Sequence, residues 1–178
     1  MACNSIKNFT YDACKPTLGG IKAVYMANYK DNAFVITEGE DKLIDGSVSG
    51  FAEGVEFVKY PIRKNTASFT STLNNNTDGA SYVSTELSLV FNRMETAKRI
   101  AMQALALGEC IVVAEDSNGE MWAMGVDSPV TATAGGAETG TNKSDRNAFT
   151  LILTDESLGF LYALDETAKE QLKTMIAQ

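Results

Sequence analysis

The clearest pattern along the chain is the alternation of apolar and polar side chains within residues 66–91. In the second half one face carries Val83, Thr85, Leu87, Leu89 and Phe91, and the other carries Tyr82, Ser84, Glu86, Ser88 and Val90. A period of two residues is typical of a strand with one buried face. The turn-forming run NNNTDGAS separates the two halves. The pattern predicts a long β-hairpin whose polar tip protrudes beyond the core.

Shorter β-rich runs come before this hairpin. Residues 21–29 predict a well-buried strand, with Ile21, Ala23, Tyr25 and Ala27 on one face and Val24 and Met26 on the other. Short segments around 33–37, 42–48 and 55–62 follow, separated by glycines. This spacing is typical of a β-sandwich or barrel.

Further strands are predicted after the hairpin. Residues 110–114 and 121–125 are apolar and flank Asn118–Gly119, a pair that favours a two-residue type I′ turn. The Gly- and Thr-rich residues 128–147 are predicted to form a loop. Strands are predicted at 148–154 and 158–163.

Two helices complete the pattern. Residues 93–107 predict a central helix with Asn92 as N-cap, Glu95 completing a capping box and Gly108 just beyond the end. The predicted helix runs through the apolar residues Ala97, Ile100, Ala101, Ala104 and Leu105. Asp165 is predicted to cap a final helix over 165–178, whose Ala168, Leu172, Met175 and Ile176 share one face.

These elements predict one mainly β (α+β) domain with a central helix, a long protruding hairpin and a C-terminal helix. Residues 1–20 have little periodicity and predict an N-terminal arm, 21–164 the β-sandwich or barrel domain, and 165–178 the terminal helix. A protruding hairpin exposes backbone edges that copies of the same protein would cover.

Composition excludes several kinds of function. The 178 residues include no histidine, which excludes Ser-His-Asp and Cys-His catalytic pairs and His-ligated zinc. The formal net charge of −8 and a pI near 4.6 disfavour binding to DNA or anionic membranes by charge neutralisation. We therefore expect no catalytic residues, cofactor or metal, and a structural protein rather than an enzyme.

Cysteines and apolar segments predict where the protein is made. The three cysteines, Cys3, Cys14 and Cys110, are widely spaced and predicted to be free thiols, as in a reducing compartment. No run approaches the roughly 20 apolar residues of a membrane span, and the polar start lacks the apolar core of a secretory signal. We expect synthesis in a cytoplasm, without a membrane anchor.

Local motifs favour structural interpretations. Residues 135–144 resemble a phosphate-binding loop, but Lys143 comes two residues late and a strand follows. Asp116, Asn118 and Glu120 alternate as calcium ligands do, yet glycine falls at the wrong position, which favours a turn. Acidic pairs such as Asp155–Glu156 could serve a glycosidase, but nothing places two of them in one cleft. Trp122 is predicted to be a core residue.

The order of elements resembles that of the tail tube proteins of tailed phages and related contractile machines. The resemblance lies in KYPIRKNTASFTSTLNNNTDGASYVSTELSLVFNRMETAKRIAMQALALGE and IVVAEDSNGEMWAMGVDSPVTATAGGAETGTNKSDRNAFTLIL, and it covers roughly residues 20–165. It is carried by element order and by phrases such as EDSNGEMWAMG, and it is closest to proteins from phages and prophages of gut bacteria.

The resemblance implies a function. It implies a β-sandwich or barrel that forms hexameric rings, stacked into a virion tail tube that is assembled in the bacterial cytoplasm. The partners would be further copies, other tail proteins, and DNA passing through an acidic lumen without specific binding. The residues expected at the subunit interface lie in the long hairpin: Phe69, Leu73, Val83, Leu87, Leu89 and Phe91.

Three alternatives remain open from the sequence. The chain could be another ring protein of a virion, such as a tail terminator or head–tail connector. It could form a secretion-type tube that moves protein. From a different class, it could be a small-ligand or carbohydrate-binding module that uses residues 128–147.

Overall fold

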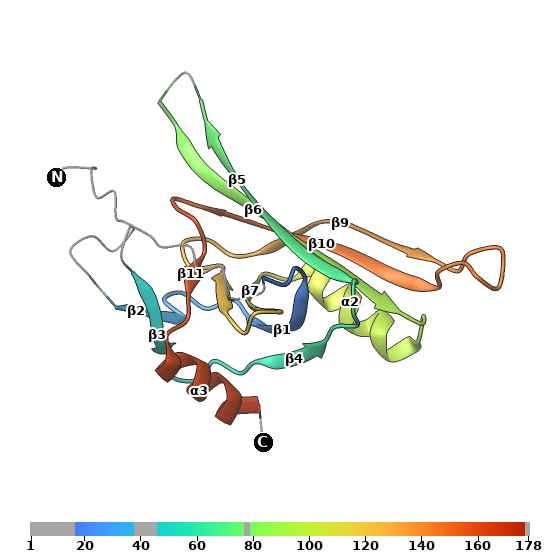
Figure 1. The fold of residues 1–178 in the computed structure, drawn as a ribbon, viewed down its shortest axis with the longest axis horizontal. Helices are drawn as coiled ribbons and strands as arrows, with labels where there is room; N and C mark the ends of the chain where they lie inside the picture. The colour runs from blue at the N-terminus through green and yellow to red at the C-terminus, as the bar shows by residue number, and fades with distance from the viewer. Residues whose placement is uncertain (1–16, 38–45, 77–78, 177–178) are drawn as a thin grey trace.

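The computed structural model describes residues 17–37, 46–76 and 79–176. It is mainly β, with about half of the residues in strands and 15% in helix. The predicted arm over residues 1–20 lies almost entirely outside the described residues, as does most of the strand predicted at 42–48. In Figure 1 the strands within residues 67–92 extend beyond the rest of the fold at the top, and those within residues 131–157 extend at the right.

Three antiparallel sheets form the described part of the fold. The first sheet has the order β11-β8-β7-β1-β4, the second β5-β6-β10-β9, and the third pairs β2 with β3. The first sheet contains β1 (Ile21–Asn28), β4 (Val58–Pro61), β7 (Cys110–Asp116), β8 (Met121–Met124) and β11 (Tyr162–Ala163). The second contains β5 (Ala67–Asn75), β6 (Ser81–Asn92), β9 (Thr131–Glu138) and β10 (Ala148–Ser157). The third contains β2 (Phe34–Thr37) and β3 (Ser47–Phe51), and the described helices are α2 (Thr96–Leu107) and α3 (Glu166–Ile176).

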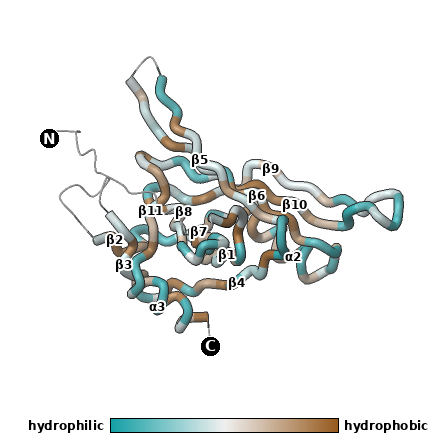
Figure 2. Tube along the Cα trace, in the orientation of Figure 1, coloured by the Kyte–Doolittle hydropathy of each residue, from teal (hydrophilic) through white to brown (hydrophobic). Residues whose placement is uncertain are grey.

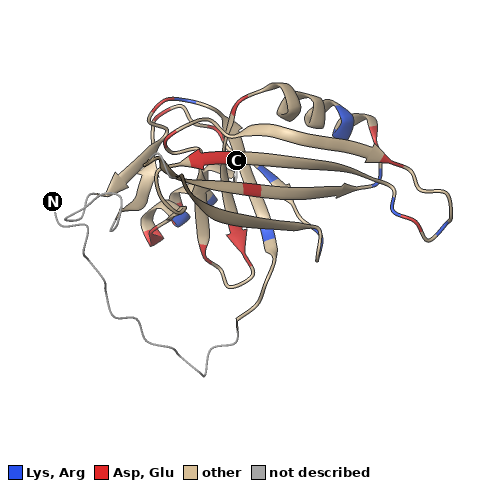
Figure 3. Ribbon diagram, turned by 90° about the horizontal axis from the view of Figure 1, so that it is seen from above, with Lys and Arg blue, Asp and Glu red and all other residues tan. Residues whose placement is uncertain are grey.

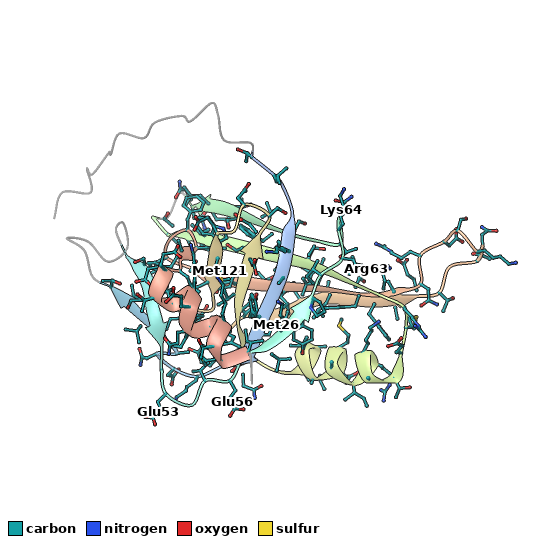
Figure 4. The ribbon with its side chains drawn as sticks, turned by 60° about the horizontal axis from the view of Figure 1, so that its bottom comes forward. Met26, Glu53, Glu56, Arg63, Lys64 and Met121 are labelled. Atoms are coloured by element: carbon teal, nitrogen blue, oxygen red, sulfur yellow. The ribbon has the colours of Figure 1, made fainter. Side chains whose placement is uncertain are left out.

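The first sheet is covered on both faces, which explains its nearly continuous apolar strands. One face packs on the second sheet, where Val24, Met26 and Val112 meet Leu87 and Leu151. The opposite face packs on the third sheet and α3, in a cluster that contains Tyr25, Val113, Met121, Phe51 and Leu172. Met26 and Met121, labelled in Figure 4, thus belong to different clusters. The predicted β-sandwich is present, with an extra layer on one side.

The face assigned to Ile21 in the sequence is wrong, although the other assignments in β1 are right. The pairing of β1 with β7 shifts register between Ile21 and Ala23, as in a β-bulge. The extra residue in a bulge shifts the alternation, so the side chains before it lie on the face opposite to the one that strict alternation predicts. Ile21 therefore joins Val24 and Met26 between the two large sheets rather than Ala23 on the opposite face.

The hairpin of β7 and β8 is confirmed, but its turn differs from the predicted type I′. The Asp116 amide donates to the Glu120 carbonyl over 2.9 Å, which leaves a three-residue connection. Only Gly119 in this connection has a positive φ, +93°, whereas a type I′ turn needs two. Asp116 Oδ1 accepts the amides of Asn118 and Glu120 at 2.8 and 2.9 Å. The carboxylate considered as a calcium ligand therefore holds the turn.

The start of the central helix also differs from prediction. α2 begins at Thr96 with Glu95 as N-cap and no side-chain cap. Arg93 has φ +67°, which excludes a helix that starts at Arg93 with Asn92 as its N-cap. Gly108 ends the helix in an extended conformation, and a Cβ there would lie 2.9 Å from the Ala104 carbonyl oxygen.

Two predictions made from Gly- and Leu-rich sequence are also wrong. Residues 128–147 are not a loop throughout, because β9 takes up eight of them. The strand predicted at 158–163 is reduced to the two residues of β11, because β10 continues to Ser157. β9 is a strand because it pairs with β10, and β11 is limited to the residues that pair with β8. In both cases strand pairing, rather than the local sequence pattern, determines the structure.

The predicted cap of the final helix is confirmed. Asp165 Oδ1 accepts the Ala168 amide at 2.8 Å, and Ala168 and Leu172 are fully buried in the cluster that α3 shares with the first and third sheets. Replacing Asp165 with alanine is expected to cost about 1 kcal/mol of unfolding free energy, because one amide of the first turn loses its acceptor. Urea unfolding followed by circular dichroism would measure the loss. An Asp165→Asn control should retain most of the stability, since the amide oxygen can accept the same bond.

Candidate assembly surface

The second sheet has two open edges. Within the described residues β5 pairs only with β6, and β9 pairs only with β10. Because every neighbouring pair is antiparallel, β5 and β9 run in opposite directions. Neither strand contains lysine or proline, and Glu138 is their one charged residue. Natural proteins usually protect such edges with charge, proline or bulges. β9 has one such irregularity, a register shift opposite Ile152 and Leu153, whereas the pairing of β5 is regular.

One face of this sheet has no second layer over it within the described part of the chain. Its outward-facing residues alternate with the buried ones and are mostly Ser and Thr. They include Ser68, Thr70, Thr72 and Asn74 on β5, Tyr82, Ser84, Glu86, Ser88 and Val90 on β6, and Thr150, Ile152, Thr154 and Glu156 on β10. A shallow depression lies over Thr70, Asn74, Tyr82 and Glu86. The uncovered face is therefore mainly polar.

The charge on the second sheet has one sign. Its four strands contain Glu86, Glu138, Asp155 and Glu156 and no lysine or arginine. Figure 3 shows these acidic positions along the strands, with basic residues in loops, helices and the other sheet. Glu138 pairs with Arg146 in the following loop. Glu86 and Glu156 therefore give the uncovered face a negative charge.

Asp155 differs from the other acids because its side chain is buried. It lies on the covered face of β10, opposite Thr85, and is 2% exposed. Burial raises its pKa to about 6, and the charges of Asp127 and Glu156 act in the same direction. The Gly125 amide, 3.3 Å from Oδ1, opposes this rise. A carboxyl group in such a place is protonated more easily than an exposed one.

The predicted long hairpin is confirmed in pairing and in burial. β5 and β6 pair from Ala67–Leu89 to Asn75–Ser81, and Val83, Thr85, Leu87 and Leu89 are buried as the alternation predicts. Ser71 and Thr85 hydroxyls lie 2.7 Å apart, and Ser81 donates to Asn75 Oδ1 at 2.6 Å near the tip. The tube of this hairpin extends past the end of its pairing with β10, with hydrophilic positions on one strand near the tip (Figure 2).

The six expected interface residues lie in different environments. Val83, Leu87 and Leu89 are at most 1% exposed and belong to the covered face of the subunit. Phe69 and Phe91 are partly buried, with ring contacts to Trp122 at 6.5 Å and Tyr60 at 5.9 Å. Leu73 is 50% exposed on the protruding part. In the single chain, Leu73 is therefore the most accessible of the six to a neighbour.

The sequence pattern missed an exposed apolar face on α2. Met102 is the buried residue of this helix, and Ala101 and Leu105 are partly buried. Ala97, Ile100 and Ala104, which are apolar residues of the predicted helix, are exposed. Because apolar residues occur all around the helix, periodicity could not select the buried side.

The groove nearest to the predicted ligand loop is lined by both polar and apolar residues. It has a volume of about 440 Å³ and lies between α2 and strands β9 and β10. Its apolar lining includes Met102 and Phe149, and its polar lining consists of Arg99, Gln103, Thr133 and Thr150. Among these residues Arg99 is the one that carries a charge.

The cluster around Glu115 is a structural network. Glu115 Oε1 and Oε2 accept from Lys22 Nζ and the Tyr25 hydroxyl, both at 2.8 Å. Burial opposes ionisation of Glu115, but these hydrogen bonds and the Lys22 charge outweigh it and lower its pKa. Among residues 17–37, 46–76 and 79–176, no group of three or more His, Cys, Asp or Glu could hold a metal ion. Cys110 is a buried free thiol, whereas Cys3 and Cys14 lie outside the described residues.

Comparisons with known proteins identify no relative: no family model, curated protein or solved structure matches the chain. No helix in the described part of the chain is long and apolar enough to cross a membrane.

Proposed function

We propose that this chain is a structural subunit that joins copies of itself into rings, and that the rings stack into the tail tube of a phage or prophage. The resemblance of residues 20–165 to tail tube proteins suggests the tube. The observation that carries the proposal is the second sheet, whose two edge strands are open among the described residues, nearly free of charge and opposite in direction.

Strand direction explains why these edges suit a ring. When copies are related by rotation about one axis, β9 of one copy comes to lie beside β5 of the next. The two strands then run antiparallel, as all the neighbouring pairs within the sheet do. A head-to-tail contact of this kind closes into a ring and leaves no free edge. The resemblance implies six copies in each ring.

The same geometry determines which face would line the channel. The first sheet and α2 cover one face of the second sheet, so only the polar face with Glu86 and Glu156 is free to face a lumen. DNA phosphates passing such a wall would be repelled rather than held. The absence of Lys and Arg from the four strands fits passage without binding.

Negative-stain electron microscopy across protein concentration, with mass photometry, tests this proposal. Rings or tubes with a central hole are expected. A closed ring that never stacks would instead indicate a tail terminator or connector. A persistent monomer would overturn self-assembly and favour the ligand-binding alternative. The presence of tubes does not distinguish DNA passage from protein secretion. Identifying the assembled particle or the neighbouring genes would make that distinction.

A variant pair tests whether the hairpin takes part in assembly. Leu73→Asp is expected to prevent ring formation, because it places a charge on a half-exposed apolar side chain of the protruding hairpin. Val35→Asp is the matched control: Val35 is 49% exposed on β2, away from the hairpin, and its variant should assemble normally. Equal assembly of both variants would exclude Leu73 from the subunit contact.

A further inference from the structure

The turn between β7 and β8 holds the stretch of chain just before β1. The Leu18 amide donates to Asn118 Oδ1 at 2.9 Å, and Asn118 Nδ2 donates to the Leu18 carbonyl at 3.0 Å. The Ser117 amide donates to the Gly20 carbonyl at 3.0 Å, and the Ser117 hydroxyl lies 3.0 Å from the carbonyl oxygens of Gly19 and Gly20. We call these contacts between the turn and the preceding backbone the turn clamp.

The turn clamp holds the side chain of a chemically labile pair. Asn118 and Gly119 form the one Asn-Gly pair in the sequence. In such a pair the glycine nitrogen can attack the side-chain carbonyl carbon of asparagine, because glycine has no side chain to obstruct the approach. Both residues are exposed to water. Apart from its chain neighbours, no described residue comes within 4 Å of the position that a Cβ on Gly119 would occupy.

Both reacting groups are engaged in the structure. The Asn118 amide uses its oxygen and its nitrogen on Leu18, and the Gly119 N–H donates to the Asp116 carbonyl at 3.2 Å. Attack on Cγ turns the planar side-chain amide into a tetrahedral centre and then expels Nδ2. The reaction therefore cannot be completed while both bonds between Asn118 and Leu18 remain.

We propose that Asn118 is a deamidation site that the turn clamp protects, and that deamidation prevents the clamp from forming again. The Gly119 nitrogen loses its proton and bonds to Asn118 Cγ, the bond from Cγ to Nδ2 breaks, and ammonia leaves. Water then opens the resulting succinimide ring at either carbonyl, which gives aspartate or isoaspartate. One water is consumed for each ammonia released, and nothing is oxidised or reduced. The reaction needs a single chain and is independent of ring formation.

The product cannot make the contacts of Asn118. Aspartate has no Nδ2–H to donate to the Leu18 carbonyl, so two acceptor oxygens would face each other where the 3.0 Å bond was. The new charge also lies beside Asp116, whose Oδ1 accepts the Asn118 amide at 2.8 Å, and like charges repel. Isoaspartate in addition lengthens the backbone of the turn. Residues 18–20 are therefore expected to leave the turn.

Ser117→Ala tests the protection, because it removes the hydroxyl contacts of the clamp and keeps the Asn-Gly pair. Deamidation at mildly alkaline pH, followed by peptide mass spectrometry, should be about fivefold faster than in the wild type, since losing one hydrogen bond shifts the clamp toward its open state by about that factor. Ser49→Ala is the matched control: the Ser49 hydroxyl donates to the Val35 carbonyl in the third sheet, and this variant should react like the wild type.

The wild type unfolded in urea gives the rate without protection, and the folded protein should react more slowly. Equal rates for the folded and unfolded wild type, or equal rates for the wild type and Ser117→Ala, would overturn the protection by the clamp.

Asn118→Asp tests the consequence, because it introduces the aspartate product directly. Hydrogen exchange at the Leu18 and Ser117 amides should be at least about fivefold faster than in the wild type, since both amides donate within the clamp. Circular dichroism would establish that the variant is folded. Unchanged exchange at both amides in a folded variant would show that the clamp survives deamidation, and it would overturn the release of residues 18–20.

Discussion

Replacing Leu87 with alanine is expected to lower the free energy of unfolding by about 2–5 kcal/mol, whereas Leu73→Ala should change it by less than about 1 kcal/mol. Both residues lie in the long hairpin and both were expected at the subunit interface. They differ in burial: Leu87 is fully buried against Val24 and Met26, and Leu73 is half exposed. Deleting buried methyl groups costs their transfer free energy and leaves a cavity.

Urea unfolding at protein concentrations below the onset of assembly would measure both effects. Trp122 fluorescence is a suitable signal, because its ring contacts Phe69 of the same hairpin at 6.5 Å. The comparison also separates folding from assembly, since Leu87→Ala should reduce assembly only as far as it unfolds the subunit. Equal and small losses at both positions would contradict the packing between the two large sheets.

The hairpin itself could be predicted because its information is local. Val83, Thr85, Leu87 and Leu89 alternate with polar residues, and a run of Asn, Asp and Gly marks the reversal. One face of the pair packs on a sheet and the other stays uncovered, so the period of two is undisturbed. The cap of α3 was predictable for the same reason, since Asp165 contacts an amide only three residues away.

Elements that depend on distant partners could not be predicted. β9 is rich in Gly, Ala and Thr and has no alternation, and it is a strand because β10 pairs with it. Ile21 changes face through a bulge that arises only in pairing with β7. The exposed apolar side of α2 could not be distinguished from the buried side, because Ala and Leu occur all around the helix. Residues 128–147 were predicted to form a loop because of their Gly and Thr content, so β9 was missed as an edge of the second sheet.

Part of the candidate assembly surface could be predicted from the sequence. The hairpin and the acidic charge were apparent, and so was the need to cover an exposed edge. The pairing order showed that β9 is the second edge and that it runs opposite to β5. Burial then divided the six expected interface residues into core residues such as Leu89 and the exposed Leu73.

Replacing Asp155 with asparagine is expected to stabilise the subunit at pH 8 and to have almost no effect at pH 4. Burial raises the pKa of Asp155 to about 6, above the value of 3.8 expected in an unfolded chain. The folded protein therefore holds a proton at this site between pH 4 and 6 that the unfolded chain releases. Stability due to Asp155 is present below pH 4 and is lost as the pH rises through 6.

The size of the effect follows from the pKa difference. A rise from 3.8 to about 6 corresponds to about 3 kcal/mol of unfolding free energy at pH 8. Asparagine stays neutral, and its amide oxygen can accept the Gly125 hydrogen bond that Asp155 Oδ1 accepts at 3.3 Å. The difference between variant and wild type should therefore grow from near zero at pH 4 to this value at pH 8, in urea unfolding at several pH values.

Glu156→Gln is the matched control, because it removes one negative charge from the neighbouring, exposed position. It should change the pH dependence only slightly, through the smaller contribution that the Glu156 charge makes to the pKa of Asp155. A difference that is the same for both variants would mean that net charge, rather than burial, causes the effect. A variant Asp155→Asn less stable than the wild type at pH 8 would mean that the buried carboxylate is ionised and held by its neighbours.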